Sequence, residues 1–352
     1  MNLIIRADAD SQMGTGHLMR SLALGQAWQD AGGQVAFVTG TRAAALVSRL
    51  QSEGMTVVPI PGPPGGQEDA LFTANQARSL GARWVVVDGY HFGADYQRLI
   101  KESGLSLLFL DDYGHCDHYY ADMVLNQNIH AHEGFYAKRE AYTRLLLGTR
   151  YALLRREFWP WRGWRREIPE VARKVLVTLG GGDPENVTLK VMRALAQVDI
   201  DDLEAVVVVG GANPHLELLQ REIGAESKLE LLINVTYMPE LMAWADIAVS
   251  AGGSTSWELA FMGLPHVITY FAANQFPIAQ HMDAAGAAIN FGDQQKICGE
   301  NFARDFEKIL ICQKLRTKLS HSAQRLVDAR GGTRLVEMIS MGIVKDQVIS
   351  IC

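Results

Sequence analysis

A glycine-rich stretch near the start of the chain holds the residues best suited to chemistry. Residues 13–20 read Met-Gly-Thr-Gly-His-Leu-Met-Arg and lie between an apolar run at 3–7 and a helical pattern. Gly14 and Gly16 let a ligand approach the backbone closely, and the N-terminus of a helix favours an anion. His17 is expected at the carboxyl end of the first strand, where open α/β sheets bind ligands. This stretch alone fits a ligand loop and a plain tight turn equally well.

The elements that position this stretch alternate between apolar runs and helical patterns. Strands are predicted at 3–7, 34–39, 55–59, 83–88 and 106–111, with helices around 18–31, 42–53, 67–80 and 94–103. The second half repeats the alternation, with strands at 174–179, 204–209, 229–234, 247–250 and 266–270 and mostly helix from about 301 to 343. Such βαβ series predict parallel sheets in an α/β fold.

Length and composition restrict the class of protein. The chain has 352 residues, enough for two domains, of which 48% are hydrophobic and 20% charged, with a net charge of −6. The acidic balance argues against nucleic-acid binding, and no uncharged apolar stretch is long enough to span a membrane. Unpaired cysteines at positions 116, 298, 312 and 352 are typical of reduced thiols, and no signal-peptide pattern is seen. We therefore expect a cytoplasmic protein.

Three patterns in the first half admit a functional and a structural interpretation. Residues 111–118 read Asp-Asp-Tyr-Gly-His-Cys-Asp-His, but the spacing matches no standard metal site, so a polar loop is favoured and no metal or other cofactor is expected. Asp8-Ala-Asp10 resembles an aspartyl phosphatase motif only faintly. Arginines and tryptophans alternate over 155–166, as in a segment for membranes or single-stranded nucleic acid, but a connector between domains is favoured.

Two glycine-rich stretches follow predicted strands in the second half. After Gly181 and Gly182 come Asp183, an expected helix N-cap, and Pro184, expected at the first helical position. This turn either binds a phosphate or only reverses the chain. Residues 252–265 read Gly-Gly-Ser-Thr-Ser-Trp-Glu-Leu-Ala-Phe-Met-Gly-Leu-Pro, which predicts a helix N-terminus able to hold a diphosphate.

The 252–265 stretch resembles the donor-binding signature of GT-B glycosyltransferases, in which glycines precede Ser-Thr, a Glu and Gly-x-Pro. Residues 234–238, Asn-Val-Thr-Tyr-Met, look like the loop whose backbone reads uracil in such enzymes. With the Gly-Thr-Gly-His-x-x-Arg stretch, the chain resembles the UDP-sugar hydrolases of pseudaminic acid biosynthesis over nearly its whole length. The further residues that carry this resemblance are Arg6-Ala-Asp8, Asp88-Gly-Tyr90, Asp111-Asp112, 148–158, 179–184, Asn274-Gln275 and 328–334. Gly89, where a histidine is expected, and the tail after Arg334 depart from the pattern.

The resemblance implies a fold, a reaction and a site. The fold is GT-B, two Rossmann-like domains facing across a cleft: 1–152 with the Gly-His loop, a connector at 153–170, a UDP-binding domain at 171–325 and a tail, 326–352, returning to the first domain. The reaction is metal-independent hydrolysis of a UDP-activated 2,4-diacetamido-2,4,6-trideoxyhexose, with His17 as general base. The implied substrate contacts are Asp8, Gly14, Gly16, Arg20, Tyr90, Arg155, Gly181, Gly182, Met238, Gly253, Ser254, Thr255, Glu258, Asn274 and Gln275.

Particular roles follow for some of these residues. Glu258, about one turn into its helix, can accept hydrogen bonds from both ribose hydroxyls. Asp8, on the same loop as His17, is the expected partner that fixes the imidazole tautomer. Tyr90 and Asn274 are implied as contacts to the sugar and phosphates. The expected ligand is a UDP-sugar, with no nucleic acid, no stable membrane association, and a monomeric or weakly homo-oligomeric state.

Two other functions remain open. A glycosyltransferase of the same fold would pass the sugar to an acceptor, and the fold alone does not decide between transfer and hydrolysis. A transferase with a lipid acceptor needs an apolar, basic face, which only residues 159–166 would supply. A non-catalytic nucleotide-sugar sensor would have no need of His17.

Overall fold

The computed structural model describes residues 1–9, 14–210, 213–223, 228–297 and 299–349, which form two compact units. Met1–Ala9, His17–Arg156 and Ala329–Cys352 make the first unit, and Asp10–Gly16 and Glu157–Asp328 make the second. Asp10, Met13, Cys298 and Cys352, which figure in the sequence interpretation, lie outside the described residues. Cys116 and Cys312 carry free thiols.

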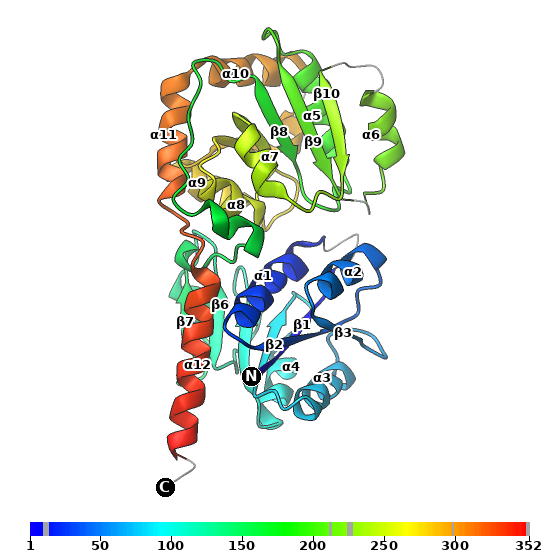
Figure 1. The fold of residues 1–352 in the computed structure, drawn as a ribbon, viewed down its shortest axis with the longest axis vertical. Helices are drawn as coiled ribbons and strands as arrows, with labels where there is room; N and C mark the ends of the chain where they lie inside the picture. Colours follow the sequence, from blue (N-terminus) through cyan, green and yellow to red (C-terminus); the bar gives the residue numbers. More distant parts are fainter. Residues whose placement is uncertain (10–13, 211–212, 224–227, 298, 350–352) are drawn as a thin grey trace. The chain divides into compact units, whose positions relative to one another are not determined.

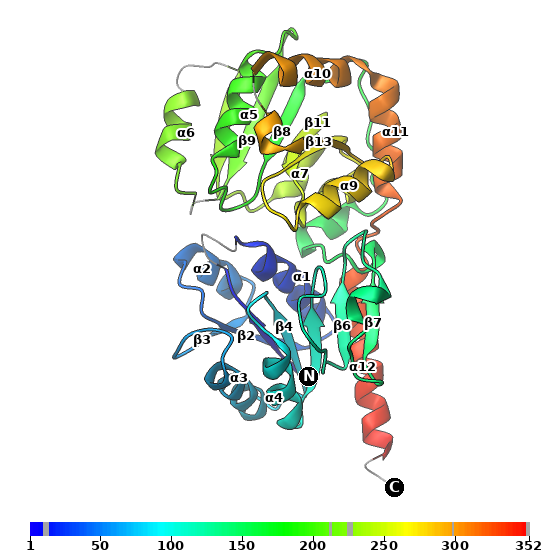
Figure 2. The ribbon, with the colours of Figure 1, turned by 180° about the vertical axis from the view of Figure 1, so that it is seen from behind.

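The first unit is built on a seven-stranded parallel sheet with the order β3-β2-β1-β4-β5-β6-β7. Its strands are β1 (Asn2–Ala7), β2 (Gln34–Thr39), β3 (Thr56–Pro59), β4 (Trp84–Asp88), β5 (Ser106–Leu110), β6 (Met123–Asn126) and β7 (Arg144–Leu147). Its helices are α1 (Gly16–Asp30), α2 (Ala44–Ser52), α3 (Gln67–Ser79), α4 (Ala94–Glu102) and α12 (Gly331–Ile349), with short 3-10 turns at Glu133–Tyr136 and Thr149–Tyr151. Helices α1 and α2 cover one face of the sheet, and α3 and α4 cover the other (Figures 1 and 2).

The second unit repeats this plan with a six-stranded parallel sheet of order β10-β9-β8-β11-β12-β13. Its strands are β8 (Lys174–Thr178), β9 (Glu204–Val209), β10 (Leu229–Ile233), β11 (Ile247–Ala251), β12 (His266–Tyr270) and β13 (Ile289–Asp293). Its helices are α5 (Val187–Ala196), α6 (Leu216–Ile223), α7 (Met238–Trp244), α8 (Thr255–Phe261), α9 (Phe276–Ala284), α10 (Gly299–Ile311) and α11 (Gln313–Gln324). Short 3-10 turns span Arg156–Trp161, where the chain passes from the first unit to the second, and Gln294–Lys296. Helices α5 and α7 lie on opposite faces of the sheet (Figures 1 and 2).

Both sheets are buried on both faces, which explains their continuous apolar runs. In β1, Ile4 packs in one core with Ala74 of α3 and Ile100 of α4. Leu3 and Ile5 are equally buried but point to the opposite face, because side chains alternate along a strand. In this buried setting, the polar residues that end the strands are placed together at one edge of each sheet.

The α/β architecture with parallel sheets is as predicted, and two kinds of local difference stand out. Strands β6, β7 and β13 are not predicted; β6 and β7 have only four residues each and lie among polar loops. Pro184 is not at the first helical position, since α5 begins only at Val187. Asp183 is not the N-cap residue, which is Asn186, but its carboxylate still accepts the backbone N–H groups of Val187 and Thr188, both at 2.8 Å.

A long tail helix completes the first unit. Helix α12 begins at Gly331, where a Cβ atom would come within 2.3 Å of the Ala152 carbonyl oxygen, so only glycine fits this approach. Arg334 donates a hydrogen bond to the Arg150 carbonyl oxygen at 2.7 Å. None of the helices in the described part of the chain has the length and apolarity needed to cross a membrane.

His266 makes the stability of the second unit sensitive to acid. It is fully buried in β12, its Nδ1 contacts the Leu264 carbonyl oxygen at 3.0 Å, and Nε2 has no hydrogen-bond partner among the described residues. Burial lowers the pKa of this imidazole to about 4, against the hydrogen bond to Leu264. In the unfolded chain a histidine titrates near 6.5, so between these values the unfolded state binds more protons and the native state loses stability as the pH falls.

We expect the free energy of unfolding to drop by about 2–3 kcal/mol between pH 7 and pH 4 because of His266. Urea unfolding of wild type and His266→Gln at both pH values measures this contribution, because glutamine has no proton to gain. An equal acid sensitivity in the two proteins would contradict the assignment to His266.

Candidate functional site

The strand order in the sheet of the first unit reverses between β1 and β4, and polar residues lie together at this point. Ala7 and Asp88 are register partners at the carboxyl ends of the two strands. In doubly wound sheets, ligands bind at the carboxyl edge where the strand order reverses. His17, at the start of α1, and Tyr90, just after β4, lie at this edge.

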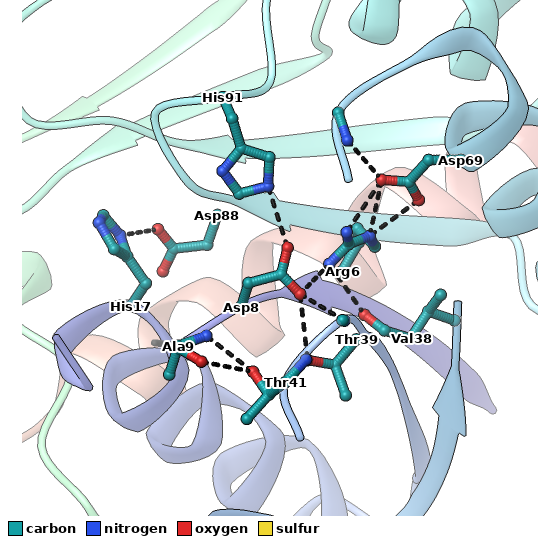
Figure 3. A network of polar contacts seen from close by, with 12 residues as sticks. Arg6, Asp8, Ala9, His17, Val38, Thr39, Thr41, Asp69, Asp88 and His91 are labelled. Atoms are coloured by element: carbon teal, nitrogen blue, oxygen red, sulfur yellow. Dashed lines mark hydrogen bonds and ion pairs between the residues drawn. The ribbon is translucent and has the colours of Figure 1, made fainter. Parts of the chain in front are cut away.

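His17 is held by a carboxylate that ends the neighbouring strand. Its Nδ1 lies 2.7 Å from Oδ1 of Asp88, which is fully buried (Figure 3). An ionised carboxylate only accepts hydrogen bonds, so this contact places the proton on Nδ1. Nη2 of Arg20 also lies 3.1 Å from Nδ1. Because a protonated Nδ1 cannot accept a hydrogen bond, Nη2 donates instead to Oδ1 of Asp88 at 2.7 Å. The lone pair of the neutral ring is therefore on Nε2.

Arg20 joins a buried carboxylate, that of Asp88, and a part-buried one, that of Asp112, into one cluster. Its Nε and Nη2 atoms donate to the two oxygens of Asp88 at 2.8 and 2.7 Å, and Nη1 donates to Asp112 at 2.7 Å. Burial opposes ionisation of both aspartates, yet the charge of Arg20 and the hydrogen bonds hold each pKa below its usual range. With two carboxylates against one guanidinium, the cluster carries excess negative charge beside His17. A proton arriving on the imidazole would offset that charge.

Aromatic rings border the imidazole of His17. The Tyr90 ring meets it edge to face, with centroids 4.6 Å apart and an interplanar angle of 88°. The Tyr90 hydroxyl donates a hydrogen bond to Oδ2 of Asp112 at 2.7 Å, so Tyr90 is part of the same cluster. The ring centroids of Tyr113 and Tyr90 are 5.2 Å apart, and Tyr113 is 43% exposed. Aromatic rings therefore line the outer side of the cluster.

Asp8 does not hold the His17 imidazole, contrary to the sequence-based expectation. Its Oδ1 accepts hydrogen bonds from Arg6, Thr39 and the Gly40 backbone, and its Oδ2 accepts one from His91. The strand geometry explains the difference. Asp8 follows β1 directly and points to groups of the neighbouring strands, whereas His17 comes later and reaches back to β4.

The remaining predicted residues of the first half are placed less closely around His17. Gly16 begins α1 and is exposed, and Gly14 has a φ of +77°, which explains the preference for glycine there. Arg155 is buried just before the 3-10 turn at Arg156–Trp161. Of the predicted substrate contacts, Arg20 and Tyr90 are joined with His17 in one network.

The second unit has two glycine-rich loops at the point where its own strand order reverses. Ser250 of β11 and Thr178 of β8 are register partners, so the loops after these strands leave neighbouring strand ends. The N-terminus of α5 is already occupied by the Asp183 carboxylate. By contrast, the side chain of Ser254, the N-cap residue of α8, makes no capping hydrogen bond. The capping pattern therefore favours α8 over α5 as the end available to an anion.

Of the other predicted ligand residues of the second unit, those of the 274–275 turn lie against this loop. A Cβ atom on Gly252 would come within 2.5 Å of the Gln275 carbonyl oxygen, so the Gly252 loop and the 274–275 turn touch. Glu258 is half-buried in α8, and Met238 is buried at the start of α7. Asn274 is exposed, whereas Gln275 accepts a hydrogen bond from the Phe271 backbone at 3.1 Å.

Three functional candidates were not among the predicted site residues. Asp88, Asp112 and Asn128 complete the cluster, and Asn128 donates to Asp112 at 2.7 Å. The sequence carries a signal for the two aspartates, because one predicted strand ends at Asp88 and another ends at Asp111, directly before Asp112. Asn128 follows β6, a strand that is not predicted, so no sequence signal points to it.

The acidic and histidine-rich loop at 111–118 is held together by hydrogen bonds to Asp111, while its Asp112 belongs to the His17 cluster. Asp111 accepts the backbone N–H groups of residues 112, 113 and 114, and the Nδ1 atom of His115 lies 3.1 Å from it. Despite burial, which acts in the opposite direction, Asp111 raises the pKa of His115 to about 10. Within the described ranges, no three His, Cys, Asp or Glu side chains are arranged to hold a metal ion.

Comparison with known proteins extends the resemblance seen in the sequence. No protein-family model matches the chain. It is 26% identical over 343 residues to the spore coat polysaccharide biosynthesis protein SpsG of Bacillus subtilis (strain 168), covering 96% of this chain and 98% of that one. It is 24% identical over 301 residues to the UDP-2,4-diacetamido-2,4,6-trideoxy-beta-L-altropyranose hydrolase of Campylobacter jejuni, covering 83% and 99%. The predicted resemblance to such hydrolases is thereby confirmed.

Solved structures establish the fold class. MurG of Acinetobacter baumannii superposes with a TM-score of 0.64 at 16% identity, over 97% of this chain and 100% of that one. The chain therefore has the predicted GT-B type of α/β fold.

Proposed function

We propose that the protein hydrolyses a UDP-activated 2,4-diacetamido-2,4,6-trideoxyhexose to UDP and the free sugar, as a step of pseudaminic acid formation. The observation that carries this proposal is the His17–Asp88 pair, with its 2.7 Å contact at Nδ1. It leaves Nε2 of a neutral imidazole as a proton acceptor at the ligand edge of the sheet. The similarity to a UDP-sugar hydrolase supports the substrate class.

In the proposed reaction, a water molecule attacks the anomeric carbon of the sugar. Nε2 of His17 takes one water proton, a C–O bond forms from the water, and the C–O bond to UDP breaks with its electron pair leaving on the diphosphate. UDP is a good leaving group, so no strong general acid or metal is required. Attack opposite the leaving group inverts the configuration at the anomeric carbon. The excess negative charge of Asp88 and Asp112 stabilises the imidazolium formed.

The UDP moiety is proposed to bind the second unit. The start of α8, with Gly253, Ser254 and Thr255, suits the diphosphate, because the Ser254 side chain makes no capping hydrogen bond there. Glu258, in the first turn of α8, suits the two ribose hydroxyls because an ionised carboxylate accepts more than one hydrogen bond.

Replacing Glu258 with alanine is expected to weaken UDP binding by about 1.5–3 kcal/mol, the value of hydrogen bonds to a charged group. Calorimetric titration with UDP measures this change. Glu240→Ala, an acidic residue in the first turn of the neighbouring α7, is the matched control. UDP affinity equal to wild type in Glu258→Ala would contradict the assignment of the ribose site.

Hydrolysis in ¹⁸O-labelled water is expected to place the label on the sugar and not on UDP, because water attacks carbon in this mechanism. Mass spectrometry of both products gives the position of the label. Label on UDP would mean attack at phosphorus and would overturn the role given to His17.

A glycosyltransferase with the same donor is the second candidate, because the fold is shared with MurG. Incubating the protein with the UDP-sugar alone separates the functions. Equal amounts of free UDP and free sugar indicate a hydrolase, whereas release only after an acceptor is added indicates a transferase. Binding without turnover under either condition indicates a sensor. A panel of UDP-sugars in the same assay identifies the sugar.

A further inference from the structure

Two histidine–aspartate pairs cross between the same two strand ends of the first unit. His17, which follows β1, contacts Asp88 at the end of β4. His91, which follows β4, contacts Asp8 just after β1, with Nε2 and Oδ2 3.0 Å apart. Figure 3 shows both pairs. The proposed mechanism uses only the first of them.

Both oxygens of the Asp8 carboxylate are held by hydrogen bonds. Its Oδ1 lies 2.5 Å from Nη1 of Arg6, 3.1 Å from the Thr39 hydroxyl and 2.6 Å from the Gly40 nitrogen. Burial opposes ionisation of Asp8, but hydrogen bonds from His91 and Arg6 hold its pKa well below the usual range. Asp8 is therefore an acceptor only, so the contacting nitrogen of His91 carries the proton.

Arg6 extends this support away from the strand ends. It is fully buried, and its Nε and Nη2 atoms donate to the two oxygens of Asp69, both at 2.9 Å (Figure 3). Asp69 also accepts the Gly65 backbone N–H at 2.8 Å. A continuous chain of hydrogen bonds thus runs from the 61–66 loop through Asp69, Arg6 and Asp8 to His91.

Backbone atoms also pack against the His91 ring. A Cβ atom on Gly65 would lie 3.1 Å from Cδ2 of the ring, and one on Gly89 would lie 2.8 Å from Cε1. The Phe92 ring lies 4.0 Å away between centroids. The imidazole of His91 therefore fills space that only glycine at positions 65 and 89 leaves open. This packing of the imidazole holds the backbone that follows β4 in place.

Tyr90 stands between the two histidines in the sequence and touches the first. One end of Tyr90, its hydroxyl, is fixed by Asp112 at 2.7 Å. Its other end, the backbone, continues directly into His91. With both ends fixed, the Tyr90 ring keeps its edge-to-face contact with His17, which limits rotation of that imidazole.

We propose that His91 is a positioning residue for His17, acting with Asp8 through the backbone and ring of Tyr90. This inference deepens the proposed function and rests on it for the role of His17. Its effect is on turnover rather than on binding, because an imidazole free to rotate aims its lone pair away from the attacked carbon for part of the time.

The test compares His91→Asn with His91→Gln in the full-length protein. Both amides are polar, but only glutamine is long enough to present its N–H group near the position of Nε2. We expect His91→Asn to lower kcat about tenfold or more with KM nearly unchanged, and His91→Gln to recover most of the loss. His118→Asn, in the half-exposed pair with Glu140 at 3.0 Å, is the matched control and should match wild type.

A second readout needs no turnover. With ¹⁵N-labelled histidine, the Nδ1 proton of His17, identified by its loss in His17→Asn, is expected to shift or broaden in His91→Asn and return in His91→Gln. An unchanged kcat together with an unchanged His17 signal would overturn the proposal, as would losses that follow only the folded fraction. If no UDP-sugar is hydrolysed, the proposed function fails, but the His17 signal still decides whether His91 positions this ring.

Discussion

His17→Asn is expected to lower kcat for UDP-sugar hydrolysis by about 10²–10⁴-fold, the usual contribution of a general base. Asparagine keeps the donor that faces Asp88 but has no lone pair in place of Nε2. The attacking water then loses its proton acceptor, whereas the proposed UDP contacts of the second unit remain. UDP affinity by calorimetry should therefore equal that of wild type.

Two observations would speak against this role. A variant with wild-type kcat would make His17 a structural residue at the start of a helix. A variant that also loses UDP affinity would indicate general damage to the protein, which thermal unfolding of the same sample measures. His118→Asn again serves as the control, since His118 lies in another histidine–carboxylate pair of the same unit.

Arg20→Met is expected to destabilise the first unit by about 3–5 kcal/mol, the cost of removing one partner from a buried ion pair. Methionine fills much of the space of the arginine side chain but leaves Asp88 and Asp112 without their shared cation. Asp88 is fully buried and Asp112 is mostly buried, so water does not replace the lost interaction well. Urea unfolding near pH 7 measures the difference.

The pH dependence of that difference provides an internal check. Because Arg20 holds both aspartate pKa values below their usual range, its stabilisation is full above the unfolded pKa near 4 and is lost as the pH falls further. The gap between Arg20→Met and wild type should therefore narrow in acid. Arg98→Met, in an exposed helical pair, should change stability little at any pH. A small, pH-independent effect of Arg20→Met would contradict this account.

The sequence predicts the fold well because its signals are local and repeated. Alternating apolar runs and helical patterns identify the parallel sheets, and glycine-rich stretches mark the turns after β1, β8 and β11. Short strands such as β6 are missed, since four residues between polar loops give little periodic signal. The candidate residue Asn128, which follows β6, is missed with it.

The partners within the site are harder to predict than its members. His17 and Arg20 are expected from their loop, but their contacts to Asp88 lie about 70 residues away in the chain. The aspartate nearer in sequence, Asp8, is the natural first choice and is wrong. Which carboxylate meets which histidine depends on strand order and register, and these are properties of the assembled sheet.

The tail helix α12 gives the protein an unusual order of synthesis. The first unit has its sheet complete by residue 147, yet the helix that packs on residues 151 and 152 is made only after Glu157–Asp328. At about 5–20 residues per second, the ribosome needs on the order of ten to thirty seconds to translate that insertion. During this interval the nascent first unit exposes the apolar surface that α12 later covers. Translation speed and chaperone access should therefore affect the yield of this protein more than that of a chain whose domains are contiguous.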